Sequence, residues 1–191
     1  ESLGTGGALA KYAAEGVATY LVTATRGERG RFGDSKISPG PEIVGKTREA
    51  ELLSAAAELG LREVKFLDYL DGALDKVDNA EAIEKIGGHL RRVRPHVVIT
   101  FAPDGAYGHP DHIAISQLTT AAIVCAADPL FGRQSALGEP HRVAKLYFIA
   151  WSTEKWAAYQ AALRKLVVKV DGDERQAVPW PDWAITTVVD T

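Results

Sequence analysis

HVVITFAPDGAYGHPDH, residues 96–112, predicts a buried strand followed by a polar loop and the first turn of a helix. Residues 96–101 are almost continuously apolar, which is typical of a strand covered on both faces of a parallel sheet. Pro95 stops the helix expected before this strand, and Pro110 suits the first turn of a helix that runs to about Ala126. This order of strand, loop and helix indicates an α/β protein.

The rest of the chain repeats the alternation of helix and strand. Asp78 and Glu81 have the spacing of a capping box at the start of the helix that Pro95 stops. Further helices are expected at residues 2–15 and 49–59, and further strands at residues 17–23, 64–67, 143–150 and 184–189. We therefore predict a Rossmann-like α/β fold, with a mainly parallel sheet and helices on both faces. Ligands bind at the carboxyl ends of such strands, so one rim should carry residues 25–30, 68–72 and 103–112.

Composition excludes several classes of protein. The chain has 191 residues, 46% of them hydrophobic and 25% charged, which suits one domain over residues 1–191. A net charge of −3 argues against a general binder of nucleic acid or anionic membranes. The single Cys125 excludes an internal disulfide framework and is expected to be a buried thiol within a helix. The apolar stretches are too short to cross a bilayer, so we expect a cytoplasmic protein.

Both ends of the sequence indicate further residues. The chain contains no methionine and opens directly on Glu1, and it stops just after the strand expected at residues 184–189. We therefore predict that the natural domain has further residues before Glu1 and beyond Thr191.

Residues 40–47, GPEIVGKT, match the P-loop pattern of nucleotide-binding proteins. A P-loop leaves a buried strand directly, so that its amides and the following helix converge on phosphates. Here the nearest expected strand ends at Thr23, and a glycine-rich charged loop over residues 26–45 intervenes. Nucleotide binding is therefore kept only as an alternative.

His109 and His112 are the strongest candidates for chemistry. They are three residues apart in the first turn of the expected helix, so both imidazoles can point to one side of it. That geometry suits a metal ligand beside an acid–base group, with Asp111 orienting one ring. The alternative is a helix cap, with Asp111 near the positive end of the helix dipole and the imidazoles facing solvent. A hydrolytic zinc site needs about three protein ligands, and the other histidines are expected to be structural.

Several segments together resemble the LmbE-like/PIG-L family of zinc-dependent N-deacetylases. They follow the family's order along the chain and are ESLGTGG (1–7), TRGERG (25–30), TREAEL (47–52), LDG (70–72) and GHPDH (108–112). The resemblance extends to about residue 150 and is loose beyond Trp151.

The resemblance implies hydrolysis of an N-acetyl group on a glucosamine unit. It makes His112 a zinc ligand, and it places the first strand of the domain, the two other ligands and the general base before Glu1. It gives His109 the role of stabilising the oxyanion, with Asp111 holding that imidazole in its charged form. Tyr107 would add a hydroxyl donor.

Two residues in the first half of the chain also take roles from the resemblance. Arg48 would contact the substrate beyond the sugar, and Asp71 would bind a sugar hydroxyl. The alternatives for these two are a surface ion pair and a turn residue.

We therefore predict a metal-dependent amidohydrolase that uses Zn²⁺ to remove an acetyl group from an N-acetylglucosamine-containing small molecule. The partner is that small-molecule sugar conjugate, with no nucleic acid or membrane, and a homo-oligomer stays open. The other alternative is a catalytically inactive sugar-binding module. The group attached to the sugar is left open.

Overall fold

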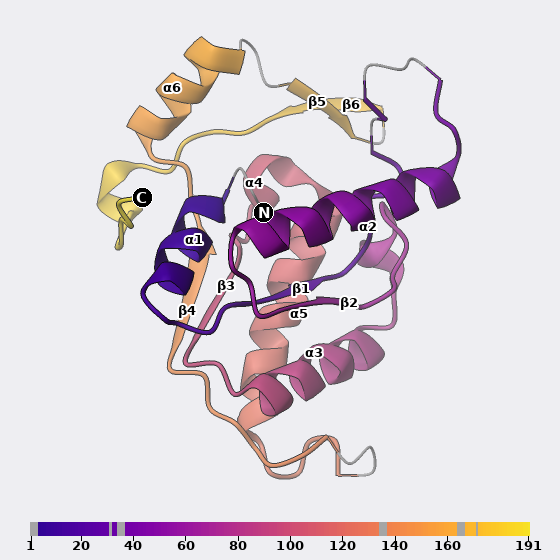
Figure 1. Ribbon diagram of the computed structural model, residues 1–191, viewed down its shortest axis with the longest axis vertical. Coiled ribbons are helices and arrows are strands. Elements are labelled where there is room, and N and C mark those ends of the chain that lie inside the picture. The colour runs from indigo at the N-terminus through magenta and orange to yellow at the C-terminus, as the bar shows by residue number, and fades with distance from the viewer. Residues whose placement is uncertain (1–3, 31, 34–36, 134–136, 164–166, 171) are drawn as a thin grey trace. The chain divides into compact units, whose positions relative to one another are not determined.

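The computed structural model describes residues 4–30, 32–33, 37–133, 137–163, 167–170 and 172–191. The chain divides into two compact units, one formed by Glu1–Leu74 with Thr187–Thr191 and the other by Asp75–Thr186. Each unit contains its own pair of parallel strands (Figure 1). The single domain expected over residues 1–191 stays a prediction.

The first unit alternates helix and strand as predicted. Its elements are α1 (Gly6–Ala14), β1 (Tyr20–Thr23), α2 (Pro41–Glu58) and β2 (Glu63–Phe66). β1 pairs with β2 in parallel, with Tyr20 opposite Glu63 and Thr23 opposite Phe66. Gly16 and Gly60 follow the two helices with φ of 84° and 70°, a left-handed conformation that glycine adopts without strain.

Helix α2 begins at Pro41, eight residues before the predicted start at Glu49. Gly40 has a φ of 105°, which turns the chain, and Pro41 has the backbone angle of a first helical residue. Residues 41–47 of the P-loop-like segment are therefore helical and cannot form a phosphate-binding loop. β1 is also shorter than predicted, because it begins at Tyr20 rather than at Val17.

The second unit holds the other parallel pair and most of the helices. After a short 3₁₀ turn, η1 (Leu74–Lys76), it contains α3 (Asn79–Val93), β3 (Val97–Phe101), α4 (Gly105–Gly108), α5 (Pro110–Ala127), β4 (Lys145–Ile149) and α6 (Thr153–Leu163). β3 pairs with β4 in parallel, with Val97 opposite Lys145 and Phe101 opposite Ile149. The side chain of Asp78 accepts a hydrogen bond from the amide of Glu81 at 3.0 Å, which confirms the predicted cap of α3.

The end of the chain differs from the prediction. β5 (Val167–Val170) and β6 (Asp173–Gln176) form an antiparallel hairpin that sequence patterning did not identify. Residues 184–189 do not form the predicted strand, since η2 (Asp182–Ala184) is a 3₁₀ turn and the chain after it is irregular. β-branched residues favour strands only where a neighbouring strand offers hydrogen bonds, and none of the described strands pairs with residues 185–189.

Helices α3 and α5 pack against each other and form the core of the second unit (Figure 1). The contact is apolar and rich in small residues, which lets two helices approach closely. Its buried members include Ala82, Ile86 and Leu90 of α3, and Ala114, Leu118 and Ala122 of α5. Cys125 lies in α5 as predicted and is half-buried.

Arg91 of α3 ties down the C-terminal end of α5. Its side chain is only 6% exposed. Its guanidinium donates hydrogen bonds to the carbonyls of Ala126 at 3.1 Å, Asp128 at 2.6 Å and Gly138 at 3.1 Å. The last carbonyls of a helix have no partner within the helix, and this cation adds a hydrogen bond to the carbonyls at this end, which also accept from the amides of His141 and Phe131.

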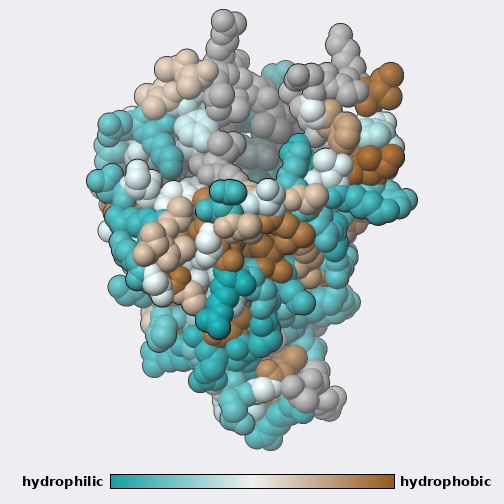
Figure 2. All heavy atoms as spheres, viewed as in Figure 1, coloured by the Kyte–Doolittle hydropathy of each residue, from teal (hydrophilic) through white to brown (hydrophobic). Residues whose placement is uncertain are grey.

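Hydrophilic side chains cover most of the face seen in Figure 2. Among the described residues, no helix combines the length and apolar character that a membrane span needs.

Replacing Arg91 should destabilise the second unit. We expect Arg91→Ala to lower the free energy of unfolding by about 3 kcal/mol, because it removes a buried side chain together with its three charge-assisted hydrogen bonds. Arg92→Ala is the control, since Arg92 is the next residue of the same helix and is exposed. Urea denaturation followed by circular dichroism measures both. Equal, small effects would show that the hydrogen bonds of the Arg91 guanidinium contribute little to stability.

Candidate active site

The loop between β3 and α5 is strained. Gly105, Ala106 and Gly108 have φ of 65°, 67° and 75°. For Ala106 this left-handed backbone costs about 1 kcal/mol, because its Cβ crowds the carbonyl oxygen. The loop is supported locally by Asp104, whose carboxylate accepts a hydrogen bond from the amide of Ala106 at 3.1 Å. We name residues 104–108 the site loop, because Ala106 and Tyr107 within the short element α4 have non-helical backbone angles and the segment leads directly into the histidine motif.

His112 is held in one tautomer by the site loop. Its Nδ1 lies 3.1 Å from the carbonyl oxygen of Gly105. A carbonyl can only accept, so Nδ1 carries the proton and Nε2 keeps its lone pair. The ring also stacks on Phe101 at the end of β3, with centroids 3.9 Å apart and planes 9° apart. An imidazole fixed in this way is typical of a metal ligand.

His109 is held in the opposite tautomer. It is the N-cap of α5, and its Nδ1 accepts a hydrogen bond from the amide of Asp111 at 3.2 Å. Nδ1 is therefore unprotonated, and in the neutral ring the proton lies on Nε2. The centroids of the two imidazoles are 4.8 Å apart. One helical turn thus presents a potential metal ligand beside a hydrogen-bond donor.

Tyr107 and Asp111 complete this cluster. The Tyr107 ring meets both imidazoles edge-on, with centroid distances of 5.9 Å to His109 and 5.2 Å to His112. Asp111 is 6% exposed and lies in the first turn of α5, where the helix dipole favours a carboxylate. The bond from its amide to His109 requires a neutral imidazole, so this contact opposes the charged form that the resemblance led us to expect.

Arg48 and Asp71 lie in the first unit and take part in local contacts. The carboxylate of Asp71 accepts the amide of Arg29 at 2.9 Å, and its own amide donates to Glu28 at 3.3 Å. Asp71 therefore joins the loop after β1 to the loop after β2. Arg48 forms an exposed ion pair with Glu51, one turn along α2, at 3.0 Å. These are the contacts that the structural alternatives predicted, and the substrate roles of both residues stay predictions.

Arg26, at the start of the charged loop expected over residues 26–45, organises the same two loops. Its guanidinium contacts Glu49 at 2.5 Å and Asp68 at 2.7 Å. It also lies over the Phe66 ring, 4.6 Å from the centroid. The hydrogen bond to Glu49 and, to a smaller extent, the hydrogen bond to Asp68 raise the pKa of Arg26 above its ordinary value. Neither carboxylate stands at a diagnostic spacing from Arg26, so no sequence signal linked them. Phe101, which stacks on His112, was expected only as part of the strand at residues 96–101.

The described residues offer one candidate metal ligand at this site. No group of three or more His, Cys, Asp or Glu side chains within them could hold a metal ion. His112 fits a metal by its chemistry, because the Gly105 carbonyl holds the proton on Nδ1 and the lone pair for coordination lies on Nε2.

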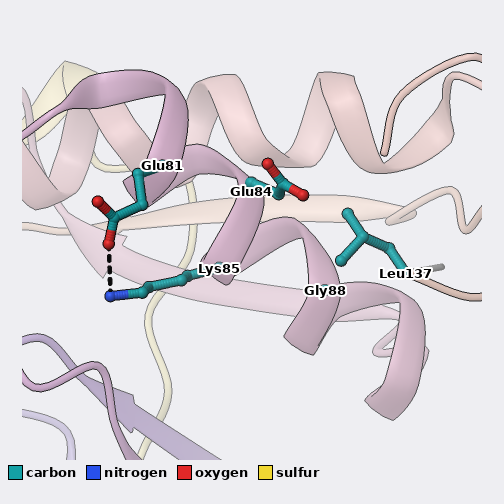
Figure 3. A pocket seen from close by; sticks show the side chains of 5 residues that line it. All are labelled: Glu81, Glu84, Lys85, Gly88 and Leu137. Carbon is teal, nitrogen blue, oxygen red and sulfur yellow. Dashed lines mark ion pairs between the residues drawn. The ribbon is translucent and has the colours of Figure 1, made fainter. Parts of the chain in front are cut away.

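A separate hollow of about 220 Å³ lies beside α3 (Figure 3). Its lining comes from one face of the helix, where Glu81 pairs with Lys85 at 2.7 Å, together with Glu84, Gly88 and Leu137. It contains no histidine, and both members of the ion pair are exposed. This hollow is not the candidate active site.

The family model described as "PIG-L: GlcNAc-PI de-N-acetylase" matches residues 1–123. The chain belongs to the PIG-L family. That match includes the site loop and both histidines, and it confirms the family that the quoted segments resembled.

Curated relatives and solved structures agree with this family. The 1D-myo-inositol 2-acetamido-2-deoxy-alpha-D-glucopyranoside deacetylase of Kineococcus radiotolerans is 34% identical over 223 residues, which cover 100% of this chain and 60% of the relative. The conserved protein TT1542 from Thermus thermophilus has a TM-score of 0.63 and 38% identity, over 78% of this chain and 60% of that one.

A more distant structure supports the fold alone. The N,N'-diacetylchitobiose deacetylase from Pyrococcus horikoshii has a TM-score of 0.65 at 22% identity, over 84% of this chain and 63% of that one. The predicted α/β fold class is confirmed by these PIG-L-like structures and by the parallel strand pairs. The chain spans about 60% of the length of the Kineococcus relative.

Adding one methyl group at Gly105 should release His112 but not His109. A Cβ there would lie 2.8 Å from Ile113 Cγ1, 3.1 Å from the Ile113 amide nitrogen and 3.3 Å from His112 Cβ. We expect Gly105→Ala to displace the carbonyl that holds Nδ1, so that His112 loses its tautomer preference while His109 keeps Nε2–H. The ¹⁵N shifts of both rings, measured by NMR on the full natural chain after chelation of metal, report this.

Gly138→Ala is the matched control for backbone strain. Gly138 has a φ of 84°, but nothing lies within 4 Å of its would-be Cβ. It should leave both imidazole spectra unchanged. Unchanged spectra in Gly105→Ala as well would mean that the Gly105 carbonyl does not set the tautomer.

Proposed function

We propose that this PIG-L chain carries the active site of a zinc-dependent hydrolase that removes the acetyl group from an N-acetylglucosamine unit in a small-molecule conjugate. The observation that carries the proposal is the pair of imidazoles in opposite tautomers on one turn of α5. Hydrolysis of an amide needs an electrophilic centre to polarise the carbonyl and a separate donor for the developing oxyanion. The relatives named as deacetylases support the same reaction.

His112 is the residue that would hold the zinc ion, through Nε2. When bound, zinc polarises an amide carbonyl and supplies hydroxide near neutral pH. The Gly105 carbonyl keeps the proton of His112 on Nδ1, and stacking on Phe101 limits rotation of the ring. Both contacts therefore orient the ligand before substrate arrives.

His109 would donate its Nε2–H to the oxygen that gains negative charge as water adds to the acetyl carbonyl. Its N-cap bond keeps Nδ1 unprotonated, so the ring starts as a neutral donor with its proton on the correct nitrogen. The Tyr107 hydroxyl is the second donor that we propose for this oxygen. The C–N bond then breaks, the proton lost by the attacking water passes to the leaving nitrogen, and the products are acetate and the free amine of the sugar.

Arg48 and Asp71 are proposed to bind substrate, Arg48 beyond the sugar and Asp71 at a sugar hydroxyl. Arg48 lies in α2, where its guanidinium also pairs with Glu51. The inositol conjugate named for the curated relatives fits this substrate class. A cytoplasmic location belongs to the same proposal.

The nucleotide-binding alternative finds no support in the geometry. Residues 41–47 are part of α2, so they do not form the loop of convergent backbone amides that a P-loop wraps around a phosphate. An inactive sugar-binding module is distinguished from the proposed enzyme by the experiment below.

The two histidines should respond differently to substitution in the full natural chain. His112→Ala should lose zinc, because a ligand is removed. His109→Ala should keep zinc and lose about 10²–10³ in kcat, the usual loss for one oxyanion donor. Zinc content by atomic emission and release of free amine from an N-acetylglucosaminyl inositol measure the two effects.

His96→Ala is the control, since His96 is exposed at the start of β3. It should keep both zinc and activity. Equal zinc loss in the His109 and His112 variants would contradict the division of roles. Sugar binding without zinc or turnover in the unsubstituted protein would favour the inactive module.

A further inference from the structure

Two side chains from the C-terminal part of the chain contact the site loop, one at each end. At its beginning, the indole N–H of Trp180 donates to the carboxylate of Asp104 at 2.9 Å. At its end, the guanidinium of Arg175, on β6, donates to the carbonyl of Gly108. Both contacts lie within the second unit, and both residues lie beyond the part of the chain that the PIG-L model matches.

Trp180 is itself anchored to the parallel strand pair that carries the site loop. Its amide donates to the carbonyl of Trp151 at 2.8 Å. Trp151 follows β4 closely, and it contacts Tyr159 of α6 edge-on at a centroid distance of 4.7 Å. β4 pairs with β3, whose end opens the site loop. Trp180, which donates to Asp104, is therefore attached through Trp151 to the chain just after β4, the strand next to β3.

Arg175 fits closely against the turn before His109. A Cβ added at Gly108 would lie 3.3 Å from Arg175 Nη1, so a larger residue would push the guanidinium away. Gly108 has a φ of 75°, and its carbonyl belongs to the peptide that links it to His109. A cation bound to that carbonyl therefore fixes the peptide plane directly before the N-cap of α5.

The site loop needs such contacts from outside. It holds three left-handed residues, one of them Ala106, and such strain persists only where surrounding structure enforces it. The carbonyl that sets the His112 tautomer belongs to Gly105, at the centre of this loop. The carboxylate of Asp104 supports the next amide, that of Ala106, and is the group that Trp180 engages.

We propose that Arg175 and Trp180 are positioning residues that clamp the site loop from both ends and thereby keep His112 oriented to bind zinc. The role of His112 in this inference rests on the proposed function, but the contacts of Arg175 and Trp180 with the site loop do not. The region after residue 123 then contributes to the chemistry without touching substrate.

Hydrogen exchange and metal titration of the full natural chain test the clamp. Arg175→Ala should speed amide exchange at Gly105–Gly108 and weaken zinc binding by about 10-fold or more, as is usual when support of a ligand is lost. kcat should fall with KM little changed. Arg175→Lys keeps one donor and should restore part of each loss.

Trp180→Phe removes the indole N–H and keeps most of the aromatic bulk. It should change exchange and zinc affinity in the same direction as Arg175→Ala, by less. This conservative variant also decides the question if Arg175→Ala fails to fold.

Matched controls exist for both substitutions. Arg133→Ala removes another arginine that donates to a backbone carbonyl, that of Pro129 at 3.2 Å. Trp183→Phe changes a tryptophan that is 87% exposed. Neither should alter exchange in the site loop or zinc affinity.

The outcomes separate the clamp from the proposed function. Exchange in the site loop that is unchanged in both Arg175→Ala and Trp180→Phe overturns the clamp. Faster exchange with unchanged zinc affinity overturns its role in orienting His112. If the unsubstituted protein neither binds zinc nor deacetylates, the proposed function fails, and exchange still decides whether the clamp exists.

Discussion

Helix α5 is held by hydrogen bonds at both of its ends, and the candidate active site depends on this restraint. At its C-terminal end the guanidinium of Arg91 donates hydrogen bonds to the carbonyls of Ala126 and Asp128. At its N-terminal end His109 caps the helix with its own side chain. Because α5 also packs along α3, the helix cannot slide or turn without breaking these contacts. The imidazoles on the first turn of α5 are therefore also held in place.

In the second unit, the apolar contacts that stabilise the fold and the strained backbone lie in different segments. The α3–α5 contact is an ordinary apolar interface, and its buried alanines and leucines stabilise the unit by removing apolar surface from water. The strain is concentrated in residues 104–108, where three backbone conformations are left-handed. A carbonyl in that strained turn, rather than one in the regular helix, selects the tautomer of His112. The core thus supports a backbone conformation that would be unfavourable alone.

In the first unit, charge organises the loops that follow the strands. Arg26 binds Glu49 and Asp68 while its guanidinium covers Phe66. The loop after β1 is thereby tied both to α2 and to the loop after β2. Asp71 adds a second link between the two loops through the amide of Arg29. Asp71, which the resemblance assigns to substrate, therefore belongs to these contacts, and Arg48 directly precedes Glu49 in α2.

Local sequence determined the elements whose signals lie within a few residues. The apolar run at residues 96–101, Pro110 and the cap at Asp78 predicted β3, α5 and the start of α3, and the GHPDH motif located both histidines. Local pattern failed at residues 184–189, where strand propensity had no partner strand among the described residues, and at α2, where Gly40 and Pro41 start the helix earlier than its alanine-rich stretch suggests.

Only the tertiary structure decided what the imidazoles can do. Their tautomers depend on which group faces each Nδ1, and the Gly105 carbonyl reaches His112 because the site loop folds back on α5. The contacts from Arg175 and Trp180 join residues that are 67 and 76 positions apart. Composition and periodicity describe what a residue prefers among its neighbours along the chain. Hydrogen bonds between distant residues depend on where the folded backbone brings donor and acceptor, and sequence pattern carries no record of that position.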